Sequence, residues 1–73
     1  MSKLPRISGR EAISALKKAG FDVIRQSSSH VIVRRVSPFS QLVIPDHREL
    51  DTGTLRAIIR QADLSVDEFI ALL

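Results

Sequence analysis

The sequence predicts an α+β domain in which a three-stranded antiparallel sheet packs against helices. Three observations predict it: apolar residues recur at helical spacing near both ends of the chain, β-branched residues dominate its middle, and 73 residues suffice for one core. We therefore expect a single domain over residues 1–73, with the order α–β–β–β–α and a short C-terminal helix. The helices should cover one face of the sheet and leave the other face open.

The first helix is predicted to begin at Ser8. Ser8 and Glu11 have the spacing of a capping box, in which each side chain accepts a hydrogen bond from an otherwise unpaired backbone N–H group. An apolar stripe at helical spacing follows: Ala12, Ile13, Leu16 and Ala19. Gly20 suits the end of this helix because glycine tolerates a positive φ.

The middle of the chain is predicted to form an antiparallel meander. The expected strands are 21–26, 30–36 and 41–44. Ser27, Ser28 and Ser29 form the first connection, and a turn over 37–40 forms the second. Because side chains alternate along a strand, Val31 and Val33 should share one face of the sheet, while His30, Ile32 and Arg34 share the other.

Two more helices are predicted after the sheet. Asp51 or Thr52 should cap the longer one, whose apolar stripe is Leu55, Ile58, Ile59 and Ala62. Ser65 and Glu68 form a second capping box for a short last helix, and its apolar face is Phe69, Leu72 and Leu73. We interpret Gly53 as part of the helix start, with room for close approach to another backbone or to a partner.

Composition argues against several classes of site. The chain has no cysteine, which excludes disulfides and thiolate metal sites, and two histidines 17 residues apart are a poor metal-ligand set. No glycine-rich phosphate loop is present, and we expect neither a metal nor a cofactor. No segment has the apolar run of a signal peptide or a membrane span, so we expect a soluble, cytoplasmic protein.

The distribution of charge points to a polyanionic partner. Residues 1–35 contain eight basic and two acidic residues, whereas residues 36–73 contain three basic and six acidic ones. A basic half of this kind either binds a polyanion or is an ordinary solvated surface. Lys17 and Lys18 carry the same ambiguity, because cations in the last turn of a helix also complement its dipole.

His30 is the strongest candidate for a catalytic side chain. Histidine can accept or donate a proton near neutral pH, and His30 is expected on the same face as Arg34. RNA carries its own nucleophile, the 2′-hydroxyl, so a single histidine could promote cleavage by deprotonating that hydroxyl or by protonating the leaving oxygen. Nearby arginines would stabilise the charge that develops on the phosphate. A Ser–His nucleophilic pair is not expected, because Ser29 and His30 would point to opposite faces if both lay in the strand.

Several segments together resemble the HicA family of mRNA interferase toxins. They are Leu4-Pro5-Arg6-Ile7-Ser8-Gly9-Arg10-Glu11, Leu16-Lys17-Lys18-Ala19-Gly20-Phe21, Arg25-Gln26-Ser27-Ser28-Ser29-His30, Ile44-Pro45-Asp46-His47 and Gly53-Thr54-Leu55-Arg56-Ala57-Ile58. The family's catalytic histidine lies in a Gly-Ser-His motif that opens the second strand, and it maps onto His30. Ser29 matches the motif, and Ser28 stands where the family has glycine.

The resemblance implies a fold like that of the double-stranded-RNA-binding domain, ribonuclease activity on mRNA, and neutralisation by a HicB-type antitoxin. With His30 as the catalytic residue, we expect the RNA to contact Ser29, Arg34, Lys17, Lys18 and Arg35. Two other hypotheses stay open: a non-catalytic RNA-binding module, and a protein-interaction domain whose basic half docks an acidic partner. His47 also matches a frequent family position, and we interpret it as a loop residue that hydrogen-bonds a helix start.

Overall fold

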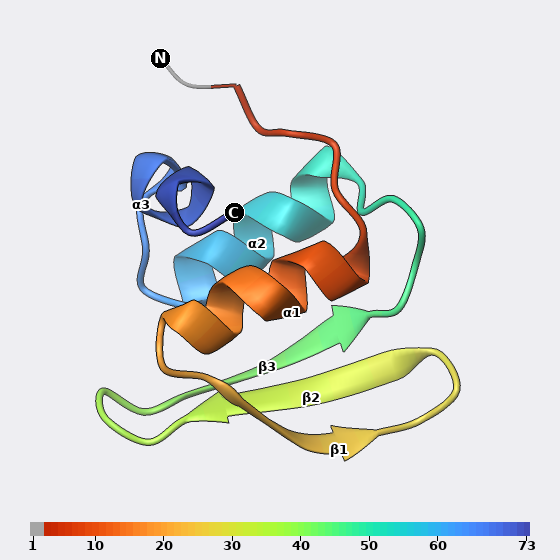
Figure 1. Cartoon of the computed structure of the whole chain (residues 1–73), viewed down its shortest axis with the longest axis vertical. Coiled ribbons are helices and arrows are strands. Elements are labelled where there is room, and N and C mark those ends of the chain that lie inside the picture. The colour runs from red at the N-terminus through yellow and green to blue at the C-terminus, as the bar shows by residue number, and fades with distance from the viewer. Residues whose placement is uncertain (1–2) are drawn as a thin grey trace.

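A computed structural model describes residues 3–73 of the chain and confirms the α+β class (Figure 1). The elements follow in the expected order: α1 (Gly9–Lys18), β1 (Asp22–Gln26), β2 (His30–Arg35), β3 (Ser40–Pro45), α2 (Thr52–Gln61) and α3 (Val66–Ala71). Their bounds differ from the predicted ones by one or two residues. No helix in this described part of the chain is long and apolar enough to span a membrane.

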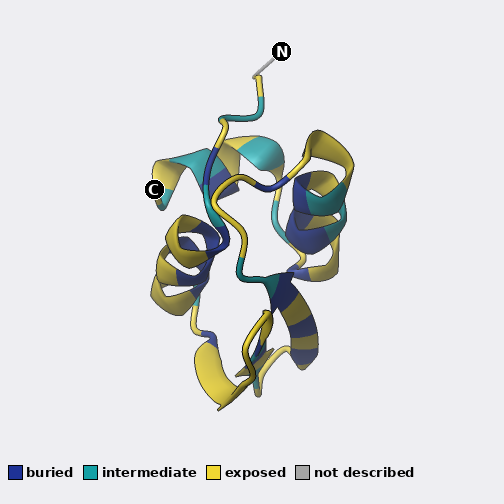
Figure 2. Ribbon diagram, turned by 90° about the vertical axis from the view of Figure 1, so that its right-hand side faces the viewer, coloured by how far each residue is buried: buried dark blue, intermediate teal, exposed yellow. Residues whose placement is uncertain are grey.

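The sheet has the order β1–β2–β3 with antiparallel pairing throughout. Helices α1 and α2 lie on one side of it, and α3 packs against α2 (Figure 1). Val31 and Val33 of β2 are buried, and β3 alternates between buried and exposed residues, which Figure 2 shows as stripes along one strand. The predicted alternation is therefore confirmed, and the face that carries Ile32 lies away from the helices.

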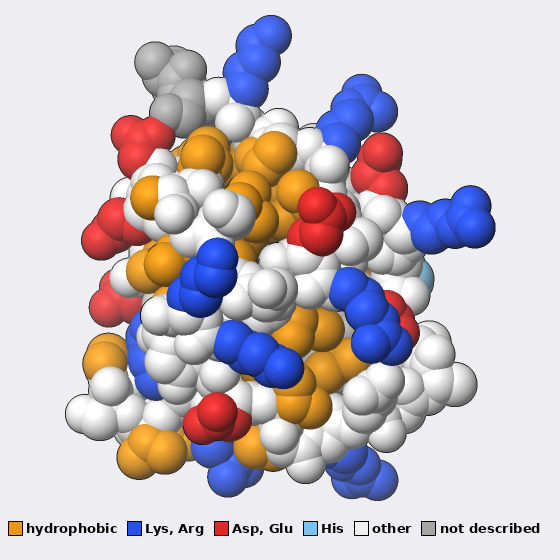
Figure 3. Space-filling view, viewed as in Figure 1, with side chains coloured by type: hydrophobic (Ala, Val, Ile, Leu, Met, Phe, Trp, Pro, Cys, Tyr) orange, Lys and Arg blue, Asp and Glu red, His pale blue; other side chains and the backbone are white. Residues whose placement is uncertain are grey.

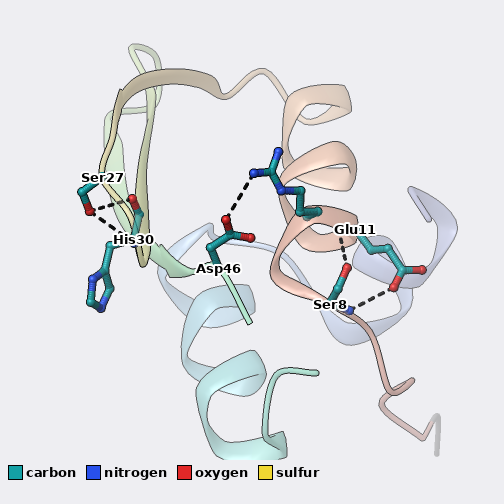
Figure 4. A network of polar contacts seen from close by, with 6 residues as sticks. Ser8, Glu11, Ser27, His30 and Asp46 are labelled. Atoms are coloured by element: carbon teal, nitrogen blue, oxygen red, sulfur yellow. Dashed lines mark hydrogen bonds and ion pairs between the residues drawn. The ribbon is translucent and has the colours of Figure 1, made fainter. Parts of the chain in front are cut away.

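All three helices begin at the predicted caps. The Ser8–Glu11 box is complete at 3.0 Å in both directions (Figure 4), and the Ser65–Glu68 box is complete as well. Asp51, rather than Thr52, caps α2 by accepting a hydrogen bond of 2.7 Å from the Thr54 N–H group. That hydrogen bond stabilises the ionised carboxylate and lowers the pKa of Asp51 below its ordinary value.

One hydrophobic core lies between the helices and the sheet. Its largest fully buried side chains are Phe21, Phe69, Leu16, Leu42, Ile44, Leu55 and Val33. The end of α2 is tied to the sheet, because the Ser40 hydroxyl donates to the Gln61 carbonyl at 2.7 Å and Arg35 donates to the Ala62 carbonyl at 3.0 Å. Carbonyl groups at a helix end otherwise lack partners. Leu73, predicted on the apolar face of the last helix, lies beyond α3 and is half exposed.

The start of α1 is in close contact with the connection between β3 and α2. The Gly9 N–H group donates to the His47 carbonyl at 2.9 Å, and the Leu50 N–H group donates to the Ile7 carbonyl at 2.8 Å. Ile7 and Leu50 are both buried. A Cβ atom at Gly9 would collide with the Pro45 carbonyl oxygen. Within the chain, the close backbone approach expected at Gly53 therefore occurs at Gly9.

His47 bonds the start of α1 through its backbone carbonyl, and not the start of the helix that follows it, α2, which Asp51 caps. Its side chain is exposed. The sequence pattern pointed to α2, because His47 lies in the loop before that helix and polar loop residues commonly form local hydrogen bonds. The pairing with α1 depends on the fold bringing residues 9 and 47 together, which no local pattern shows.

We predict opposite effects for alanine at these two glycines. Gly9→Ala should lower the free energy of unfolding by about 1–3 kcal/mol or more, because the methyl group forces the two backbones apart. Gly53→Ala should be neutral or stabilising by up to about 1 kcal/mol, because its Cβ would meet only Asp51 Oδ1 at 3.5 Å and alanine favours helix. Urea unfolding measures both variants. Equal stabilities would contradict the close approach at Gly9.

Candidate active site

The β1–β2 turn fixes the position of His30. The Ser27 N–H group donates to the His30 carbonyl at 2.9 Å. The Ser27 hydroxyl lies 3.3 Å from the backbone nitrogen of His30 and 3.2 Å from its carbonyl oxygen. Ser27 therefore closes the hairpin through both backbone and side chain (Figure 4). His30 is held as the first residue of β2 by contacts within the turn itself.

The His30 side chain is exposed and points away from α1 (Figure 4). Its Nδ1 atom lies 3.1 Å from the Ser29 hydroxyl. The two side chains meet because Ser29 belongs to the turn and not to the strand, so strand alternation does not separate them. With the hydroxyl as acceptor, the proton sits on Nδ1 and Nε2 keeps a free lone pair.

Ser28 adopts an ordinary backbone conformation. Within residues 3–73, Asp63 is the one residue other than glycine with a positive φ. The turn therefore does not require the conformational freedom of glycine at position 28. The departure from the Gly-Ser-His motif leaves the contact between Ser29 and His30 in place.

His30 borders a shallow hollow on the open face of the sheet. The hollow has a volume of about 250 Å³ and is lined by Arg25, Ser27, His30, Ile32 and Val43. Pockets for drug-sized ligands usually measure about 300–1,000 Å³, so this hollow is smaller than a typical small-molecule site. Sequence reasoning did not place Arg25, Ser27 or Val43 beside His30.

The turn that carries His30 is connected to α1 through Asp46. The Asp46 N–H group donates to the Ser29 carbonyl at 2.9 Å, and the Asp46 carboxylate forms an ion pair with Arg10 at 3.2 Å (Figure 4). The Asp46 side chain is 20% exposed, and that of Arg10 is 68% exposed. The residue after β3 therefore joins the turn that carries His30 to the first turn of α1.

The predicted RNA contacts fall on different surfaces. Arg34 shares the open face with His30, and its Nε atom donates to Gln41 Oε1 at 3.0 Å. Arg35 lies on the helix side, where its guanidinium covers the Phe21 ring at 4.7 Å from the ring centre and donates to the Pro38 and Ala62 carbonyls. These contacts give Arg35 a structural role in the free protein.

The two lysines lie on different flanks of α1. Lys17 lines a second hollow between α1 and β1, together with Arg10, Ile13, Ser14, Val23, Gln26 and Val31. Figure 3 shows apolar atoms between Lys and Arg side chains on the face that carries α1. Lys18 borders a different depression, beside Leu72 and Leu73. Adjacent residues of a helix point about 100° apart, which accounts for the separation of the two lysines.

No group of three or more His, Cys, Asp or Glu side chains among residues 3–73 is arranged to hold a metal ion. The chemistry that this part of the chain offers is a proton acceptor at His30, a hydroxyl at Ser29 and cationic side chains on the open face. Such a set suits reactions of a phosphodiester that carries its own nucleophile.

Comparison with known proteins identifies the family. A comparison with curated proteins gave no significant match. A family model described as "HicA toxin of bacterial toxin-antitoxin" matches residues 9–64, from the start of α1 through α2. This match covers more than half of the chain and includes the hairpin, the hollow and His30, so the chain belongs to the HicA family of toxins from bacterial toxin–antitoxin systems.

Proposed function

We propose that this toxin is an mRNA endoribonuclease, an mRNA interferase, with His30 as its catalytic histidine and no metal requirement. The observation that carries the proposal is the position of His30, which lies on a sheet face that no helix covers and borders a hollow lined by a cation and apolar side chains. A polymer can reach such a face along its length. A small-molecule enzyme would instead enclose its substrate in a deeper pocket.

The proposed reaction is a transesterification within the RNA. His30 Nε2 takes the proton from a 2′-hydroxyl group, and the 2′-oxygen then attacks the adjacent phosphorus. The P–O2′ bond forms and the P–O5′ bond breaks, which leaves a 2′,3′-cyclic phosphate on one product. The departing 5′-oxygen takes a proton from water and becomes a hydroxyl, and the hydroxide ion left behind takes the proton back from His30. Ser29 supports the step by accepting a hydrogen bond from the Nδ1–H group, so that Nε2 faces the substrate unprotonated.

Ser29 and Arg34 are the proposed contacts to the RNA backbone on the open face, and Lys17 and Lys18 would extend them around α1. Arg34 lies two residues beyond Ile32 on the open face, and Lys17 lies beside β1 at the border of the sheet. Arg35 would join the contacts only by leaving its partners Phe21, Pro38 and Ala62. Contacts of this kind bind phosphate without reading sequence.

Membership in a toxin–antitoxin family implies an antitoxin partner. We propose that this partner is a HicB-type protein that covers the open sheet face. Ile32 and Val43 would supply apolar contacts, and acidic side chains of the partner would complement Arg25 and Arg34. Val43 is 54% exposed in the free chain, which leaves apolar area for a partner to bury.

We predict that His30→Ala lowers the rate of RNA cleavage by about 10²–10⁴-fold and abolishes growth inhibition. The free energy of unfolding should change by less than about 0.5 kcal/mol, because the exposed ring fills no core volume. His47→Ala is the matched control, because its side chain is also exposed and should leave cleavage unchanged. Identically purified proteins are compared on one RNA. Equal cleavage by the two variants would remove His30 from the mechanism.

We predict that RNA affinity falls steeply with salt. On a 2′-deoxy oligonucleotide, which cannot be cleaved, Arg34→Gln and Lys17→Gln should each reduce the log–log salt slope by about 0.7. Arg56→Gln, an equal loss of charge on α2, is the control and should keep the wild-type slope. Unchanged slopes in both test variants would mean that neither residue contacts phosphate. Lys17 would then serve only to complement the helix dipole, and Arg34 only to hydrogen-bond Gln41.

We predict that co-expression with the antitoxin gives a complex that purifies intact, does not cleave RNA and does not arrest growth. Binding should raise the apparent stability of the toxin by about 2.7 kcal/mol when free antitoxin exceeds its dissociation constant a hundredfold. Val43→Asp should weaken the complex without unfolding the toxin, because this exposed position faces the proposed partner. A complex that cleaves RNA at the rate of the free toxin would exclude occlusion as the mechanism.

A further inference from the structure

We infer that Arg25 is a second catalytic residue, placed at the His30 hollow by a β-bulge, and that its guanidinium stabilises the phosphate during cleavage. This inference rests on the proposed ribonuclease function and adds a residue to its site. The observation behind it is the register of β1 against β2, which changes between Val23 and Arg25.

The bulge decides which face Arg25 occupies. Val23 pairs with Val33, whose side chain is buried under the helices, and Arg25 pairs with Ile32, which lies on the open face. Ile24 is the extra residue between them and is 44% exposed. Uninterrupted alternation from Val23 would have turned Arg25 toward the helices. Bulges re-aim side chains in this way and are frequent beside active sites.

The register brings Arg25 to the same hollow as His30. Gln26, the next residue, pairs with Val31 and lines the separate hollow beneath α1, so the two neighbours serve opposite faces. Arg25, Ser27 and His30 all border the hollow whose remaining sides are the apolar Ile32 and Val43. A nucleotide unit placed there would have a cation and an imidazole within one small volume.

Arg25 also differs from other arginines of the sheet and its surroundings in what it contacts. Arg10 pairs with Asp46, Arg34 with Gln41, and Arg35 with two backbone carbonyls. In the described part of the chain, Arg25 has no hydrogen-bond or ion-pair partner. Its side chain is exposed and adds nothing to the core. Its five N–H donors are therefore available to an anion.

The chemistry needs such a group. When the 2′-oxygen attacks, phosphorus becomes five-coordinate and negative charge builds on its two non-bridging oxygens. His30 moves a proton and does not neutralise that charge. A guanidinium remains charged throughout and can bond two oxygens with parallel N–H groups, whereas a lysine offers a single point charge. Donors aimed at developing charge contribute about 10²–10³-fold to the rate when one is removed.

The first test separates catalysis from binding. Single-turnover cleavage at saturating protein gives the rate constant of the chemical step, and binding of the 2′-deoxy oligonucleotide gives ground-state affinity. Arg25→Gln should lower the rate constant by about 10²–10³-fold while affinity falls much less, and Arg25→Lys should recover part of the rate. Arg56→Gln is the control for loss of one positive charge. A rate constant for Arg25→Gln equal to that of Arg56→Gln would overturn the inference.

The second test does not depend on turnover. A uridine–vanadate complex mimics five-coordinate phosphorus. A group that stabilises the transition state should contribute more to the binding of this mimic than to the binding of the 2′-deoxy oligonucleotide. Arg25→Gln should therefore weaken vanadate-complex binding by at least tenfold more than it weakens oligonucleotide binding. Equal weakening of both ligands would make Arg25 a simple phosphate contact and overturn its catalytic role. If His30→Ala cleaves like the wild type, the proposed function fails, whatever Arg25 does.

Discussion

The contact between the start of α1 and the end of β3 is the constraint on which the rest of the structure depends. Gly9 allows the helix backbone to reach Pro45 and His47, and no side chain could be accommodated between them. One residue further on, Arg10 pairs with Asp46, whose N–H group bonds the turn that carries His30. The helix, the sheet and the turn that carries His30 therefore meet at one junction, and the geometry of the turn is coupled to the position of the helix.

The two faces of the sheet differ in the side chains that they carry. The helix side carries the large apolar side chains. It also carries Arg35 and Ser40, whose hydrogen bonds to backbone carbonyls tie the end of α2 to the sheet. The open side carries His30, Arg25 and Arg34 around the apolar Ile32 and Val43. Because buried volume lies on one face and reactive groups on the other, substitutions on the open face can alter activity at small cost in stability.

Local chemistry in the sequence predicted most of the fold. The capping residues Ser8 and Ser65 marked the helix starts, and alternation in β2 separated Val33 from His30, because these signals act over a few residues. What the sequence did not show depended on contacts between distant segments. The close backbone approach at Gly9 requires Pro45 as a neighbour. The Arg35 guanidinium donates a hydrogen bond to the carbonyl of Ala62, at the end of α2 and 27 residues away in the sequence. The position of Arg25 required knowledge of a bulge, which strict alternation cannot reveal.

The hydrogen bonds between Ser27 and His30 bear on how quickly the toxin could become active once an antitoxin leaves. They lie within four residues of one hairpin, so local contacts fix the position of His30 in the isolated chain. If His30 is catalytic as proposed, no rearrangement of this turn would separate an inhibited toxin from an active one. Under the proposed occlusion, activation is then limited by how fast the antitoxin dissociates or is degraded. Affinity differences between related complexes arise mostly in dissociation rates. The lag between antitoxin loss and RNA cleavage would thus be a property of the interface, and the toxin itself would contribute no delay.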